Sequence, residues 1–192
     1  MPGPDNIFVL TESVTKSKRN GIIISGGLAS GIIVHTLIVA TGLAVLLQQY
    51  DWLFFGVKLA GVLYLLYLAY LSYQETTELV DINAMDTGVV ATQTFGELYR
   101  RGVLMNVLNP KVTLFFIAFL PQFVTQGGYA FEWQIILLGL LFMVQAFLLF
   151  SVIAIVGDRI GILLRSEQFW RYLKVIKILV LVGLAVLLLV KN

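Results

Sequence analysis

Two short segments of the chain place charged and amide side chains beside prolines. The residues are Gly3, Pro4, Asp5 and Asn6 in the first segment, and Asn106, Asn109, Pro110 and Lys111 in the second. A proline inside a helix cannot donate a hydrogen bond to the carbonyl four residues earlier, so Pro110 would leave the carbonyl of Asn106 without its helical donor. In lipid such a break must face protein or a watery cavity. Both segments therefore predict broken helices that line a polar site.

Asp5 and Lys111 give these two predicted breaks opposite charges. One anion beside one cation suits a zwitterion, whose carboxylate would face Lys111 and whose ammonium group would face Asp5. Charges inside a membrane are costly, and they usually pair or line a path for a solute. The alternative is a structural ion pair between Asp5 and Lys111. The two interpretations are compatible if the pair opens for a substrate.

His35 is the single histidine, and it follows Gly27 and Gly31 at four-residue steps. Stripes of small residues mark helix contacts in membranes, which predicts that this face is buried. The ring could carry protons, or it could only hydrogen-bond a neighbouring helix. With no cysteine and one histidine, the chain offers no soft metal site, and we predict neither a metal nor a cofactor. The scarcity of clustered His, Asp and Ser side chains argues against a membrane-embedded enzyme.

The rest of the chain is apolar enough to hold these residues inside a bilayer. Of its 192 residues 59% are hydrophobic and 12% charged, and the net charge of +2 gives no reason to expect a nucleic acid partner. The mean hydropathy is +0.91. A span needs about 20 apolar residues, and five stretches meet that length: 21–49, 52–73, 103–124, 133–157 and 172–190. Residues 7–14 are too short to cross alone. We predict an all-α, polytopic transmembrane helix bundle of five full spans plus a partial first helix.

Charge and symmetry predict how this single transmembrane domain, residues 1–192, is organised. Basic residues gather in the loops after the first, third and fifth helices, which places these odd-to-even loops in the cytoplasm. A polar loop, 75–98, separates half-repeats 1–74 and 99–192. Each half would hold three helices, so a repeat would be inverted, as in many transporters. In both halves a glycine follows the proline after seventeen residues. Chance similarity between apolar helices is the alternative.

Five segments, taken in order, resemble the lysine exporter family, specifically its homoserine/threonine exporter branch. They are Pro2-Gly3-Pro4-Asp5-Asn6, the Gly27–Gly31–His35 helix, Lys58-Leu59-Ala60-Gly61 with Tyr64-Leu65, Asn106-Val107-Leu108-Asn109-Pro110-Lys111, and Phe119-Leu120-Pro121-Gln122-Phe123. The resemblance implies a bacterial inner-membrane exporter of amino acids or related metabolites, driven by the proton gradient. In the family the first motif lies inside a complete first helix, so the resemblance also implies that this chain is N-terminally shortened.

Together these observations predict a secondary active transporter that exports amino acids by proton antiport through the lipid bilayer. Proton uptake at Asp5, with His35, would reset the cycle, and glycine-rich helix faces permit a homodimer. One alternative is a passive channel, which would need no coupling residue. Another is a membrane-embedded protein that transports nothing, although such a protein would not need charges beside helix breaks. Export of heavy metals is disfavoured by the absence of cysteine.

Overall fold

The computed structural model describes residues 4–43, 51–74, 93–125, 128–163 and 166–190, and these residues form helices and short connections without a strand. The α-helices are α1 (Pro4–Thr15), α2 (Lys18–Ile38), α4 (Asp51–Gln74), α5 (Phe95–Val107), α6 (Pro110–Phe119), α7 (Phe131–Leu163) and α8 (Glu167–Val190). The π-helix η1 (Val39–Leu43) extends α2, and the 3₁₀-helix η3 (Leu120–Phe123) extends α6. The predicted all-α class is confirmed.

The helices that can cross a bilayer lie where hydropathy predicts them. Four are long and apolar enough in the described residues, and a fifth span results if α5 and α6 count as one bent helix: Lys18–Gly42, Phe55–Gln74, Phe131–Gly157, Arg171–Val190, and Phe95–Val107 with Pro110–Phe123. The predicted first partial helix is observed as α1, which is 12 residues long. The chain is therefore a multi-pass membrane protein.

The chain divides into two compact units, each of which combines segments from both halves of the sequence. The first unit comprises 1–32, 76–108 and 142–172, and the second comprises 33–75, 109–141 and 173–192. Most of the predicted polar loop, residues 75–92, lies outside the described residues. The inverted repeat of 1–74 and 99–192 stays a prediction.

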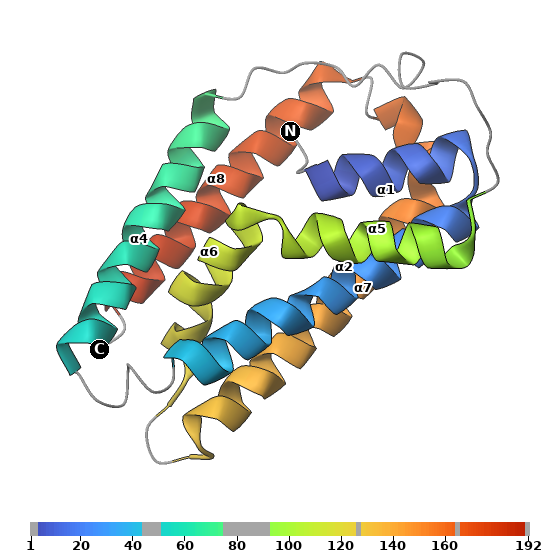
Figure 1. Cartoon of the computed structure of the whole chain (residues 1–192). Helices are drawn as coiled ribbons and strands as arrows, with labels where there is room; N and C mark the ends of the chain where they lie inside the picture. Colours follow the sequence, from blue (N-terminus) through green and yellow to red (C-terminus); the bar gives the residue numbers. More distant parts are fainter. Residues whose placement is uncertain (1–3, 44–50, 75–92, 126–127, 164–165, 191–192) are drawn as a thin grey trace. The chain divides into compact units, whose positions relative to one another are not determined.

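In the first unit, α1 and α5 are in contact and pack on the first part of α2 (Figure 1). The buried core of this unit consists of Val9, Ile24, Leu28, Leu98 and Ala154, contributed by α1, α2, α5 and α7. The Arg101 guanidinium lies over the ring of Phe8, 4.3 Å from its centroid. This cation–π contact ties α5 to α1.

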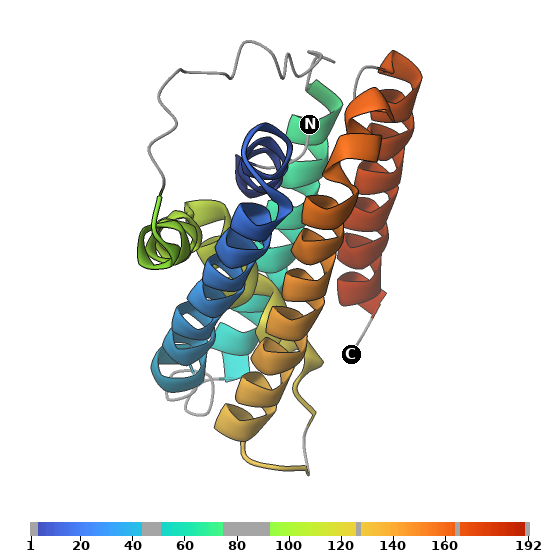
Figure 2. The same ribbon diagram turned by 90° about the vertical axis from the view of Figure 1, so that its right-hand side faces the viewer.

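In the second unit, α4 and α8 run side by side (Figures 1 and 2). Their core consists of Val62 and Leu65 from α4 with Ala185 and Leu188 from α8, and phenylalanines of α6 pack against it. A Cβ atom added to Gly61 would come within 2.7 Å of the Ala118 carbonyl oxygen. The missing side chain therefore lets α4 lie directly on the backbone of α6.

Glycines also allow α2 and α5 to approach closely in the first unit. A Cβ atom on Gly27 would collide with the carbonyl oxygen of Tyr99, and one on Gly102 would collide with the carbonyl oxygen of Ile24. Such backbone contacts are the usual means by which helices associate in lipid, where apolar side chains gain little by leaving the solvent. The predicted burial of the glycine face of α2 is confirmed.

The N-terminal end of α5 is stabilised by a capping box. The Thr94 N–H donates to Glu97 Oε2 at 2.8 Å, and the Glu97 N–H donates to Thr94 Oγ1 at 3.4 Å. The spacing of Glu97 and Arg101 predicts an ion pair along the helix. In the structure the carboxylate instead caps α5, while Arg101 lies over Phe8.

We expect Gly27→Ala to lower the unfolding free energy by about 1–3 kcal/mol, because the new methyl group forces α2 and α5 apart. Gly96→Ala is the matched control, since nothing lies within 4 Å of a Cβ atom at that helical glycine. Tryptophan fluorescence during heating of the detergent-solubilised protein measures both midpoints. Equal midpoints for the two variants would contradict the close contact.

Candidate functional site

The predicted break at Pro110 is present, and Asn109 caps the helix that follows it. Asn109 is extended, with φ −81° and ψ 104°, and its side chain accepts from the Lys111 N–H at 3.1 Å. The Asn109 carbonyl accepts from the N–H groups of Val112 at 3.1 Å and Thr113 at 3.2 Å. Pro110 stands at the first helical position, where its missing N–H costs nothing. The side-chain oxygen of Asn109 thus caps the start of α6, a structural role that we did not predict from the sequence.

Pro121 lies at a second change of helix type. The α-helix α6 ends at Phe119 and tightens into the 3₁₀-helix η3, with Pro121 near its start. The Val124 N–H donates to the Pro121 carbonyl at 3.2 Å. Gln122 is buried, with 5% of its surface exposed. The polar Gln122 side chain is therefore enclosed at the far end of α6.

His35 is buried against α6 in the second unit. Only 2% of its surface is exposed, and its ring centroid lies 5.8 Å from that of Phe116. Its Nδ1 atom is 3.3 Å from Thr113 Oγ1, which in turn lies 3.4 Å from the Asn109 carbonyl oxygen. A hydroxyl has one proton, so if Thr113 donates to Asn109, its oxygen accepts from His35. His35, Thr113 and the Asn109 carbonyl thus form a series of polar contacts that leads from the histidine to the helix break.

Tyr64 of α4 reaches the same end of α6. Its hydroxyl donates to the Lys111 carbonyl at 3.2 Å, in the first turn after Pro110. The Lys111 side chain is exposed. Three later tyrosines of α4 are more than half exposed and fit an aromatic belt: Tyr67, Tyr70 and Tyr73. Sequence reasoning missed Thr113 and the contact of Tyr64, although Thr113 stands one turn after Asn109 and Tyr64 three residues after Gly61.

The remaining predicted site residues belong to the first unit. Asp5 and Asn6 lie half-buried in the first turn of α1, where the helix dipole favours an anion. Asn106 is 3% exposed, and its side chain lies against Gly31, where an added Cβ atom would come within 2.7 Å of it. Gly3 lies outside the described residues, as does the side chain of Pro4. The interaction of Asp5 with Lys111 stays a prediction.

Three further polar contacts lie within the first unit. The Tyr99 hydroxyl of α5 donates to Ser30 Oγ of α2 at 2.6 Å. Glu12, with 5% of its surface exposed, accepts from Lys16 Nζ at 3.1 Å. Lys16 Nζ also lies 3.5 Å from Gln93 Oε1. Glu12 thus belongs to a network at the end of α1. Among the described residues no three His, Cys, Asp or Glu side chains are grouped to hold a metal ion.

Comparison with known proteins gives several relatives of this chain. An uncharacterized membrane protein of Pseudomonas aeruginosa is 33% identical over 156 residues, which cover 81% of this chain and 68% of the relative. The leucine efflux protein of Salmonella typhimurium is 28% identical over 127 residues, covering 65% of this chain and 57% of that protein. The homoserine/homoserine lactone efflux protein of the same organism is 30% identical over 124 residues, covering 64% and 57%. No solved structure matches the chain.

The family model described as "LysE type translocator" matches residues 1–192, the whole chain. This match agrees with the resemblance carried by the two proline segments and with the observed all-α membrane fold. The chain belongs to the LysE type translocator family.

Proposed function

We propose that the chain is a secondary active exporter of amino acids or related small metabolites across the bacterial inner membrane, working by proton antiport. Membership of a translocator family supports transport. The names of two relatives, a leucine efflux protein and a homoserine/homoserine lactone efflux protein, support amino acids as the substrate class and efflux as the direction. Those two matches cover little more than half of the length of each relative. The substrate class of this chain is therefore part of the proposal.

The observation that carries the proposal is the interrupted span at Asn109 and Pro110. An apolar helix that stops and restarts at a proline exposes polar backbone where a regular span would hide it. In transporters such discontinuous helices form the substrate and ion sites. Here the restart carries Lys111 and is linked through Thr113 to His35, a titratable ring with 2% of its surface exposed.

We assign roles to the site residues on this basis. Lys111 would receive the substrate carboxylate, and Asp5 would receive its ammonium group and exchange protons with it. His35 would relay protons through Thr113. The amides of Asn6 and Asn106 and the backbone at Gly3, Pro4, Asn109 and Pro110 would complete the pathway. The basic loops would face the cytoplasm, and glycine-rich helix faces would allow a homodimer.

Purified protein in liposomes tests the transport proposal. Vesicles loaded with radiolabelled leucine, homoserine or other amino acids should release at least one of them faster when the outside is acidified, because inward proton flow drives antiport. A protonophore should abolish the acceleration, and empty liposomes are the control. A current that scales with voltage and ignores the pH gradient would indicate a channel. Absence of gradient-dependent flux across the panel would refute the proposal.

The charge assignment is tested with Asp5→Asn and Lys111→Ala. We expect each to reduce efflux at least about tenfold, the effect of losing roughly 1.4 kcal/mol of interaction with the substrate. Lys177→Ala, which removes a half-buried lysine of α8, is the matched control and should retain most of the activity. Normal transport by both site variants would show that the assigned roles are wrong, even if the wild-type protein transports amino acids.

The proton relay is tested with His35→Gln and Thr113→Val. If His35 carries protons, His35→Gln should flatten the dependence of efflux on the pH gradient while preserving exchange of labelled for unlabelled substrate. Thr113→Val removes the hydroxyl between His35 and Asn109, and should weaken the same dependence less. Thermal midpoints of both variants report folding. Loss of stability with an unchanged pH dependence would reduce His35 to a structural contact.

A further inference from the structure

The outer side of α5 carries a groove that the proposed transport site does not use. Five residues of α5 and its C-cap, Leu108, line it, and we call it the α5 groove: Glu97, Arg100, Arg101, Leu104, Met105 and Leu108. Its volume is about 370 Å³. Arg100, Leu104 and Leu108 follow one another at four-residue steps, so they share one face of the helix. The groove therefore has a cationic end and an apolar end.

The cationic end of the groove is lined by two consecutive arginines, Arg100 and Arg101. Both Arg100 and Arg101 are exposed. Arg101 is held over the Phe8 ring at 4.3 Å, which limits its freedom before any ligand arrives. Glu97 would repel an anion, but it lies one turn nearer the start of α5, where its carboxylate accepts from the Thr94 N–H at 2.8 Å. Planar guanidinium groups are well matched to phosphate oxygens.

The apolar end continues along α5 for two turns. Leu104 is 45% exposed and Leu108 is 74% exposed. Met105, the residue after Leu104, is half-buried. Leu108 lies about 12 Å along the helix axis from Arg100, at 1.5 Å per residue. A ligand that fills the groove must therefore combine a compact anion with an attached hydrocarbon chain.

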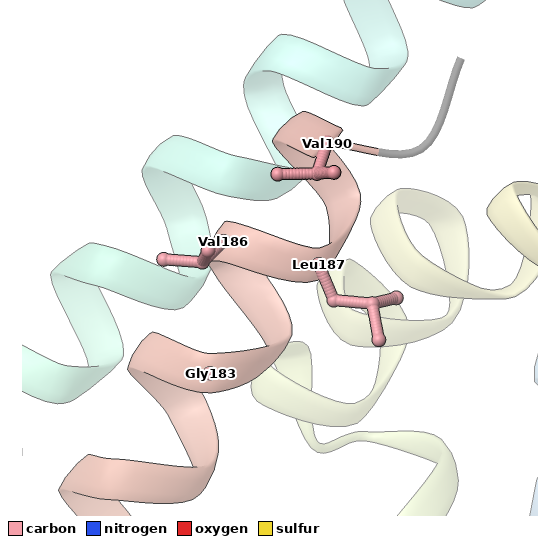
Figure 3. A pocket seen from close by; sticks show the side chains of 4 residues that line it. All are labelled: Gly183, Val186, Leu187 and Val190. Atoms are coloured by element: carbon pink, nitrogen blue, oxygen red, sulfur yellow. The ribbon is translucent and has the colours of Figure 1, made fainter.

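A second groove, on α8, lacks charged residues and serves as a comparison for the α5 groove. It is lined by Gly183, Val186, Leu187 and Val190, which carry no polar side-chain atom (Figure 3). This surface can contact lipid tails, but it has no group that distinguishes one headgroup from another. The α5 groove is different because its apolar part ends at two arginines, Arg100 and Arg101.

We propose that the α5 groove binds an anionic phospholipid, with the phosphate on Arg100 and Arg101 and one acyl chain along Leu104 and Leu108. The two arginines complement the charge of a phosphate and the leucines complement an acyl chain, on a protein that crosses a bilayer and is surrounded by lipid. Basic pockets at membrane surfaces recognise anionic headgroups in this way. The proposal needs only the membrane fold and does not depend on the transported substrate.

The test uses the full chain, delipidated in detergent, with phosphatidylglycerol as the probe. Unfolding is followed by the fluorescence of its three tryptophans, since the chain has no cysteine for thiol dyes. Native mass spectrometry counts retained lipid. We expect phosphatidylglycerol to raise the midpoint at concentrations where phosphatidylcholine and inorganic phosphate do not. Equal stabilisation by phosphatidylcholine would show that no headgroup is recognised, and equal stabilisation by phosphate would indicate a site for soluble anions; either result overturns the proposal.

The variant Arg100→Gln/Arg101→Gln should weaken phosphatidylglycerol binding by roughly tenfold to thirtyfold. The control, Arg19→Gln/Arg171→Gln, removes the same charge from two exposed arginines outside the groove and should change binding by less than about threefold. An equal loss in the control would mean that the lipid follows overall charge, which refutes the site. Because Arg101 also supports Phe8, Arg100→Gln alone provides a folded variant, and unchanged binding in it would count against the proposal.

Discussion

The bilayer interior offers no water to satisfy a free backbone N–H or carbonyl, and the arrangement of this protein follows from that constraint. A helix broken by Pro110 must find partners for its exposed groups within the protein. Asn109 supplies a cap for the restart, Thr113 adds its hydroxyl to the Asn109 carbonyl, and Tyr64 donates to the Lys111 carbonyl. The break is thus a feature that the rest of the fold stabilises, and Asn109 and Lys111 at this break belong to the proposed transport pathway.

Close backbone contact is the second condition for such a site. Gly61 allows α4 to lie on α6, which brings Tyr64 within reach of the helix start. A Cβ atom on Gly139 would collide with Thr36, so α7 packs tightly on the part of α2 that carries His35. Small residues therefore do more than strengthen helix association. They also determine which polar side chains come within hydrogen-bonding distance, because exposing a polar side chain to lipid between two separated helices is unfavourable.

The described charges divide between tertiary contacts and local ones. Arg101 lies over a ring of another helix, and Lys16, directly after α1, contacts both Glu12 of α1 and Gln93 of a distant segment. Glu97 shows the opposite preference, because its carboxylate caps its own helix. An exposed ion pair contributes little free energy, whereas a carboxylate in the first turn of a helix has unsatisfied backbone N–H groups directly beside it. Local satisfaction of the backbone therefore outweighs the pairing that charge spacing alone suggests.

The sequence alone determined the spans, the break at Pro110, and the burial of the face carrying Gly27, Gly31 and His35. These features depend on hydropathy and on the covalent geometry of proline and glycine, which act within a few residues. Only the tertiary structure decided that His35 meets Thr113, 78 residues away, and that Tyr64 meets the Lys111 carbonyl, 47 residues away. No local pattern encodes those contacts, because they depend on which helix faces are brought together and how closely the glycines allow the backbones to approach.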